Sequence, residues 1–218
     1  EQWTKPVNMG PPVNTAASEK QPCIAADGKT LYFSSNRPGG HGKMDIWKSI
    51  FENGRWSAPE NLGDQINTEE TEISPFIHPD NQTLYFASDG HIGMGGQDIF
   101  ISRMSETKKW SEPENLGYPV NTHKDEFGLI VNAIGNKAYF ATERTDSTKK
   151  DIYVFELPEK FKPNLVTYVE GTITDVTNFK PLSANIELLE LKTAESMVKT
   201  ISNPGNGEYL VCLPAGQD

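Results

Sequence analysis

A phrase that recurs three times with a period of about 53 residues limits the folds open to this chain more than any other feature. The phrase begins with tryptophan and ends with Asn-Leu-Gly at residues 56–63, and it returns at residues 110–117. A looser copy occupies residues 3–10. Each copy leads to an Asn-Thr pair, at residues 14–15, 67–68 and 121–122. The fold is therefore expected to be an array of similar units.

Two further phrases recur in the same order and with the same period. One runs through residues 27–35 and 80–88, with a weaker copy at residues 134–142. The other is Asp-Ile followed by an aromatic residue, and it begins at Asp45, Asp98 and Asp151. Three phrases that keep one order and one period are not expected by chance. They indicate three copies of one structural unit.

Each unit is predicted to contain four short strands. The turns Asp27-Gly28 and Asp80-Asn81 contain residues that tolerate positive φ. The run at residues 31–33 is continuously apolar and aromatic, which favours a strand buried on both faces. A glycine-rich loop at residues 38–42 then leads to the strand that begins at Asp45. Four short strands in roughly 50 residues are typical of the blades of a β-propeller.

The phrase Asp-Gly-Lys-x-Leu-Tyr-Phe-Ser-Ser-Asn-Arg, followed by Gly-Gly and Asp-Ile-Trp at residues 27–47, resembles the TolB-type β-propeller repeat. With its Trp-Ser-x-Pro-Glu-Asn-Leu-Gly phrase, the repeat is similar to copies in large OmpA-family envelope proteins of Bacteroidetes-like bacteria. The resemblance covers residues 1–158. The third copy departs from it, since residues 134–136 replace the Asp turn and Ala138 replaces leucine. The resemblance implies a periplasmic, outer-membrane-associated protein.

Three blades do not close a ring, because propellers have roughly four to eight. The resemblance therefore implies a fragment of a longer propeller. On this interpretation, residues 3–9 are the last strand of a blade whose other strands are missing. Alternatively, they pair with the strand at Asp151 and complete the last blade. An uncovered blade would favour self-association.

The repeat stops after residue 158, and a linker is predicted at residues 159–166. Four phrases in residues 167–218 resemble the carboxypeptidase regulatory-like domain. They lie at residues 169–175, 180–184, 206–209 and 213–216. The resemblance implies a truncated transthyretin-like β-sandwich that acts as a spacer or binding module. The predicted fold is thus all-β, a partial β-propeller of three four-stranded blades followed by this sandwich. In OmpA-type proteins a peptidoglycan-binding domain would follow, so peptidoglycan is expected to be reached only through such a domain.

Composition argues against several classes of partner. The chain has 20 Lys+Arg against 30 Asp+Glu and a net charge of −10, which disfavours nucleic acid and anionic lipid. No apolar run of about 18 residues is present, so no membrane insertion is predicted. Cys23 and Cys212 are expected to be free thiols. The histidines lack the paired spacing of metal ligands, and no metal, cofactor or catalytic residue is predicted.

The recurrent acids and aromatics are predicted to build the blades. Asp45, Asp98 and Asp151 occupy equivalent positions, whereas a catalytic pair needs two different environments. Each carboxylate is expected to accept hydrogen bonds from backbone N–H groups of the preceding glycine-rich turn. The aromatics expected to pack within the blades are Trp56, Trp110, Tyr32, Tyr85 and Tyr139. Whether the loop at residues 89–98 wraps calcium is left open.

Arg37 and Arg144 differ from the other repeated residues because the second repeat has Gly90 at that place. With His41 and Lys43 they are candidate contacts for an acidic partner surface, and a solvated loop is the alternative. The sequence predicts a non-catalytic scaffold that binds envelope proteins. A carbohydrate-binding or glycan-hydrolysing propeller remains the alternative, and it predicts two close carboxylates of unequal pKa.

Overall fold

The computed structural model describes residues 3–132, 134–144, 149–189, 191, 194 and 196–215. These residues form an all-β structure of small antiparallel sheets, none of which closes into a barrel. Their one helical element is a short 3-10 helix, η1 (Glu159–Phe161). Within the described residues, no helix is long and apolar enough to cross a membrane.

The first sheet is built from the first repeat. Strands β1 (Glu19–Ile24), β2 (Thr30–Ser35) and β3 (Asp45–Glu52) lie side by side. The short strands β4 (Arg55–Trp56) and β5 (Glu60–Asn61) both pair with β3. The repeated phrase at residues 56–63 therefore covers the edge of β3 that does not pair with β2.

The second and third sheets repeat this order. The second sheet runs β6 (Glu72–Ile77), β7 (Thr83–Ser88), β8 (Asp98–Arg103) and β9 (Glu114–Asn115). The third sheet contains β10 (Glu126–Val131), β11 (Lys137–Thr142) and β12 (Asp151–Glu156). Among the described residues, no further strand pairs with β12.

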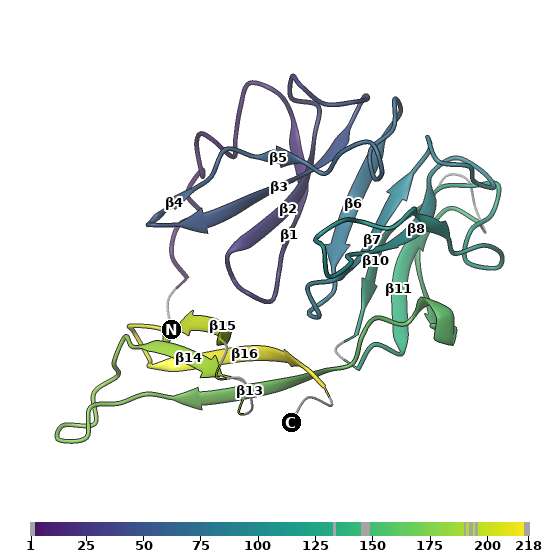
Figure 1. Ribbon diagram of the computed structural model, residues 1–218. Helices are drawn as coiled ribbons and strands as arrows, with labels where there is room; N and C mark the ends of the chain where they lie inside the picture. Colours follow the sequence, from purple (N-terminus) through teal and green to yellow (C-terminus); the bar gives the residue numbers. More distant parts are fainter. Residues whose placement is uncertain are drawn as a thin grey trace.

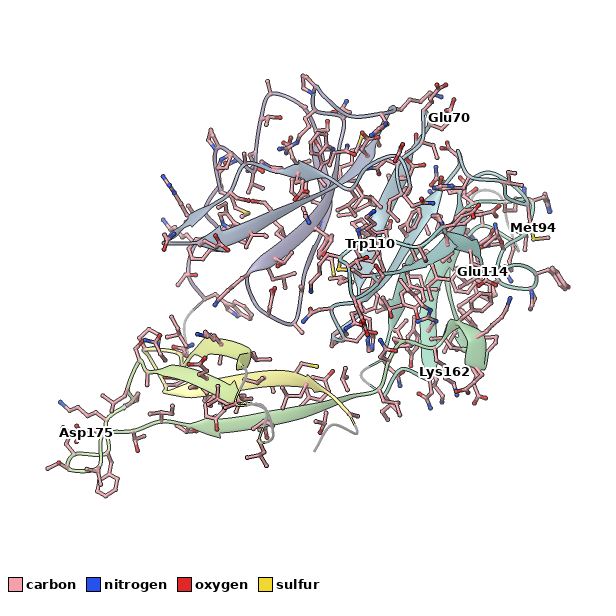
Figure 2. All side chains as sticks on the ribbon, viewed as in Figure 1. Glu70, Met94, Trp110, Glu114, Lys162 and Asp175 are labelled. Atoms are coloured by element: carbon pink, nitrogen blue, oxygen red, sulfur yellow. The ribbon has the colours of Figure 1, made fainter. Side chains whose placement is uncertain are left out.

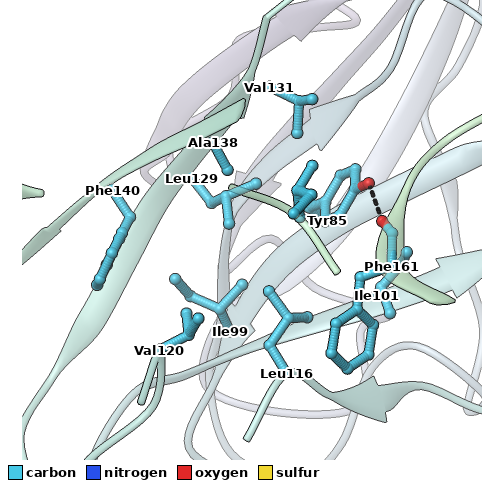
Figure 3. Packing of buried hydrophobic residues seen from close by; sticks show 11 residues of the cluster. Tyr85, Ile99, Ile101, Leu116, Val120, Leu129, Val131, Ala138, Phe140 and Phe161 are labelled. Atoms are coloured by element: carbon cyan, nitrogen blue, oxygen red, sulfur yellow. Dashed lines mark hydrogen bonds between the residues drawn. The ribbon is translucent and has the colours of Figure 1, made fainter. Parts of the chain in front are cut away.

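The three sheets lie in a row, with the second sheet between the first and the third (Figure 1). Ile46, Ile66 and Phe86 belong to the apolar cluster between the first two sheets. Ile99, Leu129 and Phe140 belong to the cluster between the second and third, which Figure 3 shows. The middle sheet is thus covered on both faces, and every residue of its central strand β7 is buried.

The third sheet has an open outer side. Burial alternates along β11, because its apolar side chains face the second sheet on one side only. The expected strand buried on both faces is found at residues 31–33 of the first sheet, but its counterpart in the third repeat is half exposed. The first sheet also lies at an end of the row, but there Leu31 and Phe33 are buried in a cluster with Val13 and Trp47. Tyr139, on the outer face of the third sheet, is 38% exposed.

A β-bulge recurs at one place in the first strand of every sheet. The pairing shifts between Lys20 and Cys23, between Ile73 and Phe76, and between Phe127 and Ile130. The residues with positive φ at these bulges are Gln21, Ser74 and Gly128. The Gln21 side chain donates to Ser74 Oγ at 2.7 Å and accepts from Ser74 N at 3.0 Å. The bulges therefore join β1 to β6, the first strands of the first and second sheets.

Residues 3–10 form no strand. The predicted strand at residues 3–9 is therefore absent, and its alternative pairing with β12 is not found among the described residues. Strands β1 to β5 all belong to the sheet that follows this segment. The Trp3 side chain is fully exposed.

The last part of the chain forms two strand pairs. β13 (Val166–Thr172) pairs with β16 (Glu208–Pro214), and β14 (Asn185–Leu189) pairs with β15 (Ser196–Ile201). β13 begins at the last residue of the predicted linker. These pairs lie beside the row of sheets (Figure 1).

The predicted linker packs against the second sheet, and we call residues 159–164 the strap. Phe161 is buried in the cluster between the second and third sheets, and its carbonyl accepts from Tyr85 Oη at 2.6 Å (Figure 3). Arg103 donates to the carbonyl oxygens of Lys160 and Lys162, each at 2.9 Å. Asn164 N donates to Asp80 Oδ2 at 2.9 Å. The strap thus follows the third sheet in the chain but is fixed to the second sheet.

Candidate functional site

The carboxylate of Asp45 organises the glycine-rich loop of the first repeat. Asp45 is buried and accepts hydrogen bonds from the backbone N–H groups of His41 at 2.5 Å and Gly42 at 3.0 Å. The side-chain amide of Asn61 donates to it at 2.8 Å. The carboxylate therefore ties the loop to strand β5.

Asp98 has the same environment in the second repeat. It accepts from the backbone N–H groups of Met94 and Gly95 and from the Asn115 amide. Burial raises the pKa of Asp98, although these hydrogen bonds act in the opposite direction. Asp151 begins β12 and is exposed. Residues 145–148, which belong to the turn before it, lie outside the described residues, so the predicted turn bonds of Asp151 remain a prediction.

The loop glycines leave room for these carboxylates. A Cβ at Gly40 would lie 2.0 Å from Asp45 Oδ2, and a Cβ at Gly93 would lie 1.9 Å from Asp98 Oδ2. Neither distance is compatible with two non-bonded atoms. A side chain at either position would therefore displace the carboxylate from its backbone donors.

We expect Gly93→Ala to lower the free energy of unfolding by about 1–3 kcal/mol, the usual cost of forcing a methyl group into packed structure. Urea unfolding measures this change. Gly205→Ala is the control, because a Cβ there meets only Asn203 Oδ1, at 3.3 Å. Equal stability of the two variants would contradict the role given to Asp98.

In each of the first two sheets, a pair of asparagines joins the segment that covers the edge of the sheet to the Asp-Ile strand. We call residues 56–67 and 110–121 the covering segments. In the first sheet, Asn67 accepts from Ile46 N at 2.7 Å and donates to Ile46 O at 3.0 Å and to Asn61 Oδ1 at 2.9 Å. Asn121 makes the same three bonds to Ile99 N, Ile99 O and Asn115 Oδ1, at 2.9, 2.9 and 2.7 Å. The recurrent Asn-Thr pair was the sequence signal for this contact, but its role was not predicted.

A glutamate four residues after each Asn-Thr pair forms a second buried network, which the sequence analysis missed. Glu72 accepts from Thr68 N at 2.8 Å and from the hydroxyls of Thr68 and Ser88, both at 2.7 Å. The third repeat uses Thr122, Glu126 and Thr142, and the first uses Thr15, Glu19 and Ser35. Each network ties the connection before a sheet to its first two strands.

The pKa values of Glu72 and Glu19 shift in opposite directions. Burial raises the pKa of Glu72, more than its hydrogen bonds from Thr68 and Ser88 lower it. Burial also acts on Glu19, but hydrogen bonds from Thr15 and Ser35 and the charge of Arg37 outweigh it, so its pKa is lowered. The repeated networks are therefore alike in geometry and unequal in electrostatics.

Arg37 belongs to this network and not to a partner-binding surface. Only 8% of Arg37 is exposed, and its guanidinium donates to Val13 O at 2.5 Å and to Glu19 Oε1 at 3.1 Å. It also lies over the rings of Phe33 and Trp47. The prediction that Arg37 contacts a partner is wrong, because its donors are already used inside the chain.

Arg144 makes the corresponding contacts in the third repeat. It donates to Pro119 O and Val120 O, lies 3.5 Å from Glu126 Oε1, and is stacked on Phe140 and Tyr153. Its side chain is 23% exposed and its Nε has no hydrogen-bond partner among the described residues, so the predicted partner contact of Arg144 stays a prediction.

The second repeat fills this place with a histidine instead of an arginine. His91 Nε2 lies 2.9 Å from Ile66 O, and its ring packs against Phe86 and Phe100. Ile66 corresponds to Val13 in the first repeat. The arginine missing from the second repeat is thus replaced by His91, one residue later in the loop.

The recurrent aromatics differ in burial. Tyr32 and Tyr85 are buried between sheets, and burial raises the pKa of both. Trp56 is half-buried with its ring 5.2 Å from that of Phe51, and Trp110 is packed against the cluster between the first two sheets. Tyr139 lies on the outer face of the third sheet and is partly exposed.

The loop side of the first two sheets remains accessible. His41 is exposed, and Lys43 forms an ion pair with Glu70, which raises the pKa of Lys43. Next to them the loop at residues 89–95 presents Ile92, which is 96% exposed, and Met94. Figure 2 labels Glu70 and Met94 on this side of the molecule. We call His41, Lys43, Glu70, Ile92 and Met94 the loop surface.

A pocket of about 310 Å³ adjoins the loop surface. Its lining combines apolar and acidic groups, and it includes Asp64, His91, Ile92, Phe100, Glu112 and Asn115. Asp89, the proposed start of a calcium loop, accepts from Thr71 N at 2.8 Å. The described residues contain no group of three or more His, Cys, Asp and Glu side chains placed to hold a metal ion.

The cysteines Cys23 and Cys212 are free thiols, as predicted. Burial raises the pKa of both thiols.

Comparison with known protein families found no match to the sequence, and comparison with curated proteins found none either.

Proposed function

We propose that this chain is a non-catalytic protein-binding scaffold built from TolB-type propeller blades, part of an OmpA-like, outer-membrane-associated protein of the periplasm. The two strand pairs after the strap would then be a truncated carboxypeptidase regulatory-like domain. One observation carries the non-catalytic part of the proposal. The recurrent acids Asp45 and Asp98 are buried and bonded to backbone N–H groups of their own loops.

The glycan-hydrolysing alternative loses its best residues through these bonds. Hydrolysis needs two carboxylates facing one substrate, one of them protonated. Glu72 and Asp98 do have raised pKa values, but both are fully buried and held by internal donors. Structural carboxylates of this kind support a rigid platform rather than a reaction.

The loop surface supports protein binding. An almost fully exposed isoleucine beside a methionine, next to a pocket and flanked by the Lys43–Glu70 ion pair, has the apolar centre and charged rim of a protein interface. The partner we propose is an envelope protein with an apolar anchor. Peptidoglycan would be reached only through a separate domain.

A quantitative pull-down from a bacterial envelope extract tests this proposal. Wild-type bait should capture a discrete protein partner in a saturable way, and Ile92→Glu should abolish that capture. Val176→Glu is the matched control, since Val176 is also exposed but lies in the last part of the chain. Recovery of glycan fragments, or a partner retained by Ile92→Glu, would overturn the proposal.

A further inference from the structure

We infer that the open edge of β12 binds residues 3–14 of a second copy of this chain, so that copies associate head to tail. This inference concerns a different surface from the loop surface and does not depend on the proposed function. It rests on how the chain covers the equivalent edges of its other two sheets.

Both complete sheets cover the Asp-Ile strand in the same way. On β3, Asn61 lies opposite Trp47, and Asn67 bonds to both backbone groups of Ile46. On β8, Asn115 lies opposite Phe100, and Asn121 bonds to both backbone groups of Ile99. The side chains of Ile46 and Ile99 are completely buried in the clusters that join their sheets to the next sheet.

β12 presents the same strand without its cover. Ile152 is the equivalent of Ile46 and Ile99, yet it is 81% exposed, and Val154 is 59% exposed. One edge of β12 pairs with β11, and no described strand pairs with the other edge. An exposed apolar edge strand is a template for pairing with another chain.

Residues 3–14 carry the same covering phrase, and among the described residues they pair with no strand. Asn8 Oδ1 accepts from Gly10 N at 2.8 Å and from Asn14 Nδ2 at 3.0 Å. Asn61 Oδ1 does the same with Gly63 N and Asn67 Nδ2, both at 2.9 Å. The turn that places the asparagine pair is therefore already formed, which reduces the entropy lost on binding.

The apolar side chains of this segment are also uncovered. Trp3, Val7 and Met9 are exposed. Met9 stands where Leu62 and Leu116 pack against the clusters between sheets. The segment thus offers apolar contacts as well as hydrogen bonds to an Asp-Ile strand.

The segment that binds β12 comes from a second copy, because residues 3–14 of the same chain precede the first sheet, at the other end of the row. Residues 3–14 precede the first sheet and β12 belongs to the third, with the second sheet between them (Figure 1). The contact uses two different surfaces, so it is heterologous. The smallest closed assembly of this kind is a dimer that contains two such contacts.

The pairing observed in the first two sheets predicts the register of the contact between copies. Asn8 of one copy should lie opposite Tyr153 of the other, and the Asn14 amide should bond to the backbone N–H and C=O of Ile152. Asn14→Ala removes the amide, and Ile152→Lys places a charge on the receiving strand. Each substitution should weaken association roughly tenfold or more, as expected for the loss of a few interface bonds.

Sedimentation velocity over a range of concentrations, with circular dichroism to verify folding, tests the inference. Wild type should form a dimer, and Asn14→Ala and Ile152→Lys should each remain monomeric at concentrations where wild type dimerises. A mixture of the two variants should recover a dimer, because one intact contact forms between the segment of Ile152→Lys and the edge of Asn14→Ala. Ile92→Lys, at another exposed isoleucine, should dimerise like wild type.

Three results would overturn the inference. The first is a wild-type chain that stays monomeric at every concentration. The second is dimerisation that survives Asn14→Ala, which would indicate two β12 edges pairing with each other. The third is a mixture of variants that recovers no dimer although both variants are folded.

Discussion

Asn121→Ala is expected to lower the free energy of unfolding by about 3 kcal/mol, because it leaves buried backbone groups without partners. Asn121 is fully buried and is the side chain that bonds to both Ile99 N and Ile99 O. Each unsatisfied buried polar group costs about 1–3 kcal/mol, and the lost contact with Asn115 adds to this. Urea unfolding of both chains measures the difference.

The chain contains its own control for this experiment. Asn14 occupies the equivalent position, with the same bond to an earlier asparagine, but among the described residues its side chain forms no hydrogen bond with a strand. At a protein concentration too low for association, Asn14→Ala should change stability by less than about 0.5 kcal/mol, as surface substitutions do. Equal effects of the two substitutions would show that the strand contact of Asn121 contributes nothing.

Arg37→Ala is expected to cost about 3 kcal/mol of stability, since breaking a buried ion pair leaves the other charge uncompensated. The substitution removes the ion pair with Glu19, at 3.1 Å, and the hydrogen bond to Val13 O. It also removes the cation from the faces of Phe33 and Trp47. Thermal or urea unfolding gives the magnitude.

Arg55→Ala is the matched control, because Arg55 is an exposed arginine in β4 of the same sheet. Its replacement should change stability by no more than about 0.5 kcal/mol. If Arg37→Ala were as stable as Arg55→Ala but lost a binding partner, Arg37 would be a contact residue after all, and the buried geometry would be misleading.

The repeated phrases predicted much of the local structure. The turn at Asp27-Gly28, the central strand at residues 31–33 and the strand that begins at Asp45 all lie where the period places them. Turn residues and continuous apolar runs are local signals, so one sequence suffices to interpret them. The recurrent bulge was not predicted, because Gln21, Ser74 and Gly128 share positive φ but no residue type.

The error at Arg37 has a physical cause. A charged residue in a glycine-rich loop is usually solvated, and sequence alone does not show that carbonyl groups 24 residues earlier converge on it. The second repeat was also misleading, because the substitute at His91 is shifted by one position. Pairing across such a separation is fixed by the packing of successive sheets and not by a local pattern.

That the described part of the third sheet has three strands was beyond a pattern-based prediction. Residues 3–9 are a looser copy of the covering phrase, but a strand needs an adjacent strand with which to exchange hydrogen bonds. Among the described residues, no strand pairs with residues 3–9. Sequence similarity therefore identified residues 3–9 as a segment able to cover the edge of a sheet. The order of the sheets decides which edge such a segment can reach.

The strap determines how tension would travel through the molecule. A pull on the C-terminal strands reaches residues 159–164 first, and these are held by Tyr85, Arg103 and Asp80 of the second repeat. Mechanical load would therefore enter the middle of the row, where both faces are packed, and bypass the end sheet with its single covered face. A tether attached at the C-terminal side would therefore pull on the second sheet, while the open edge of β12 stayed unloaded.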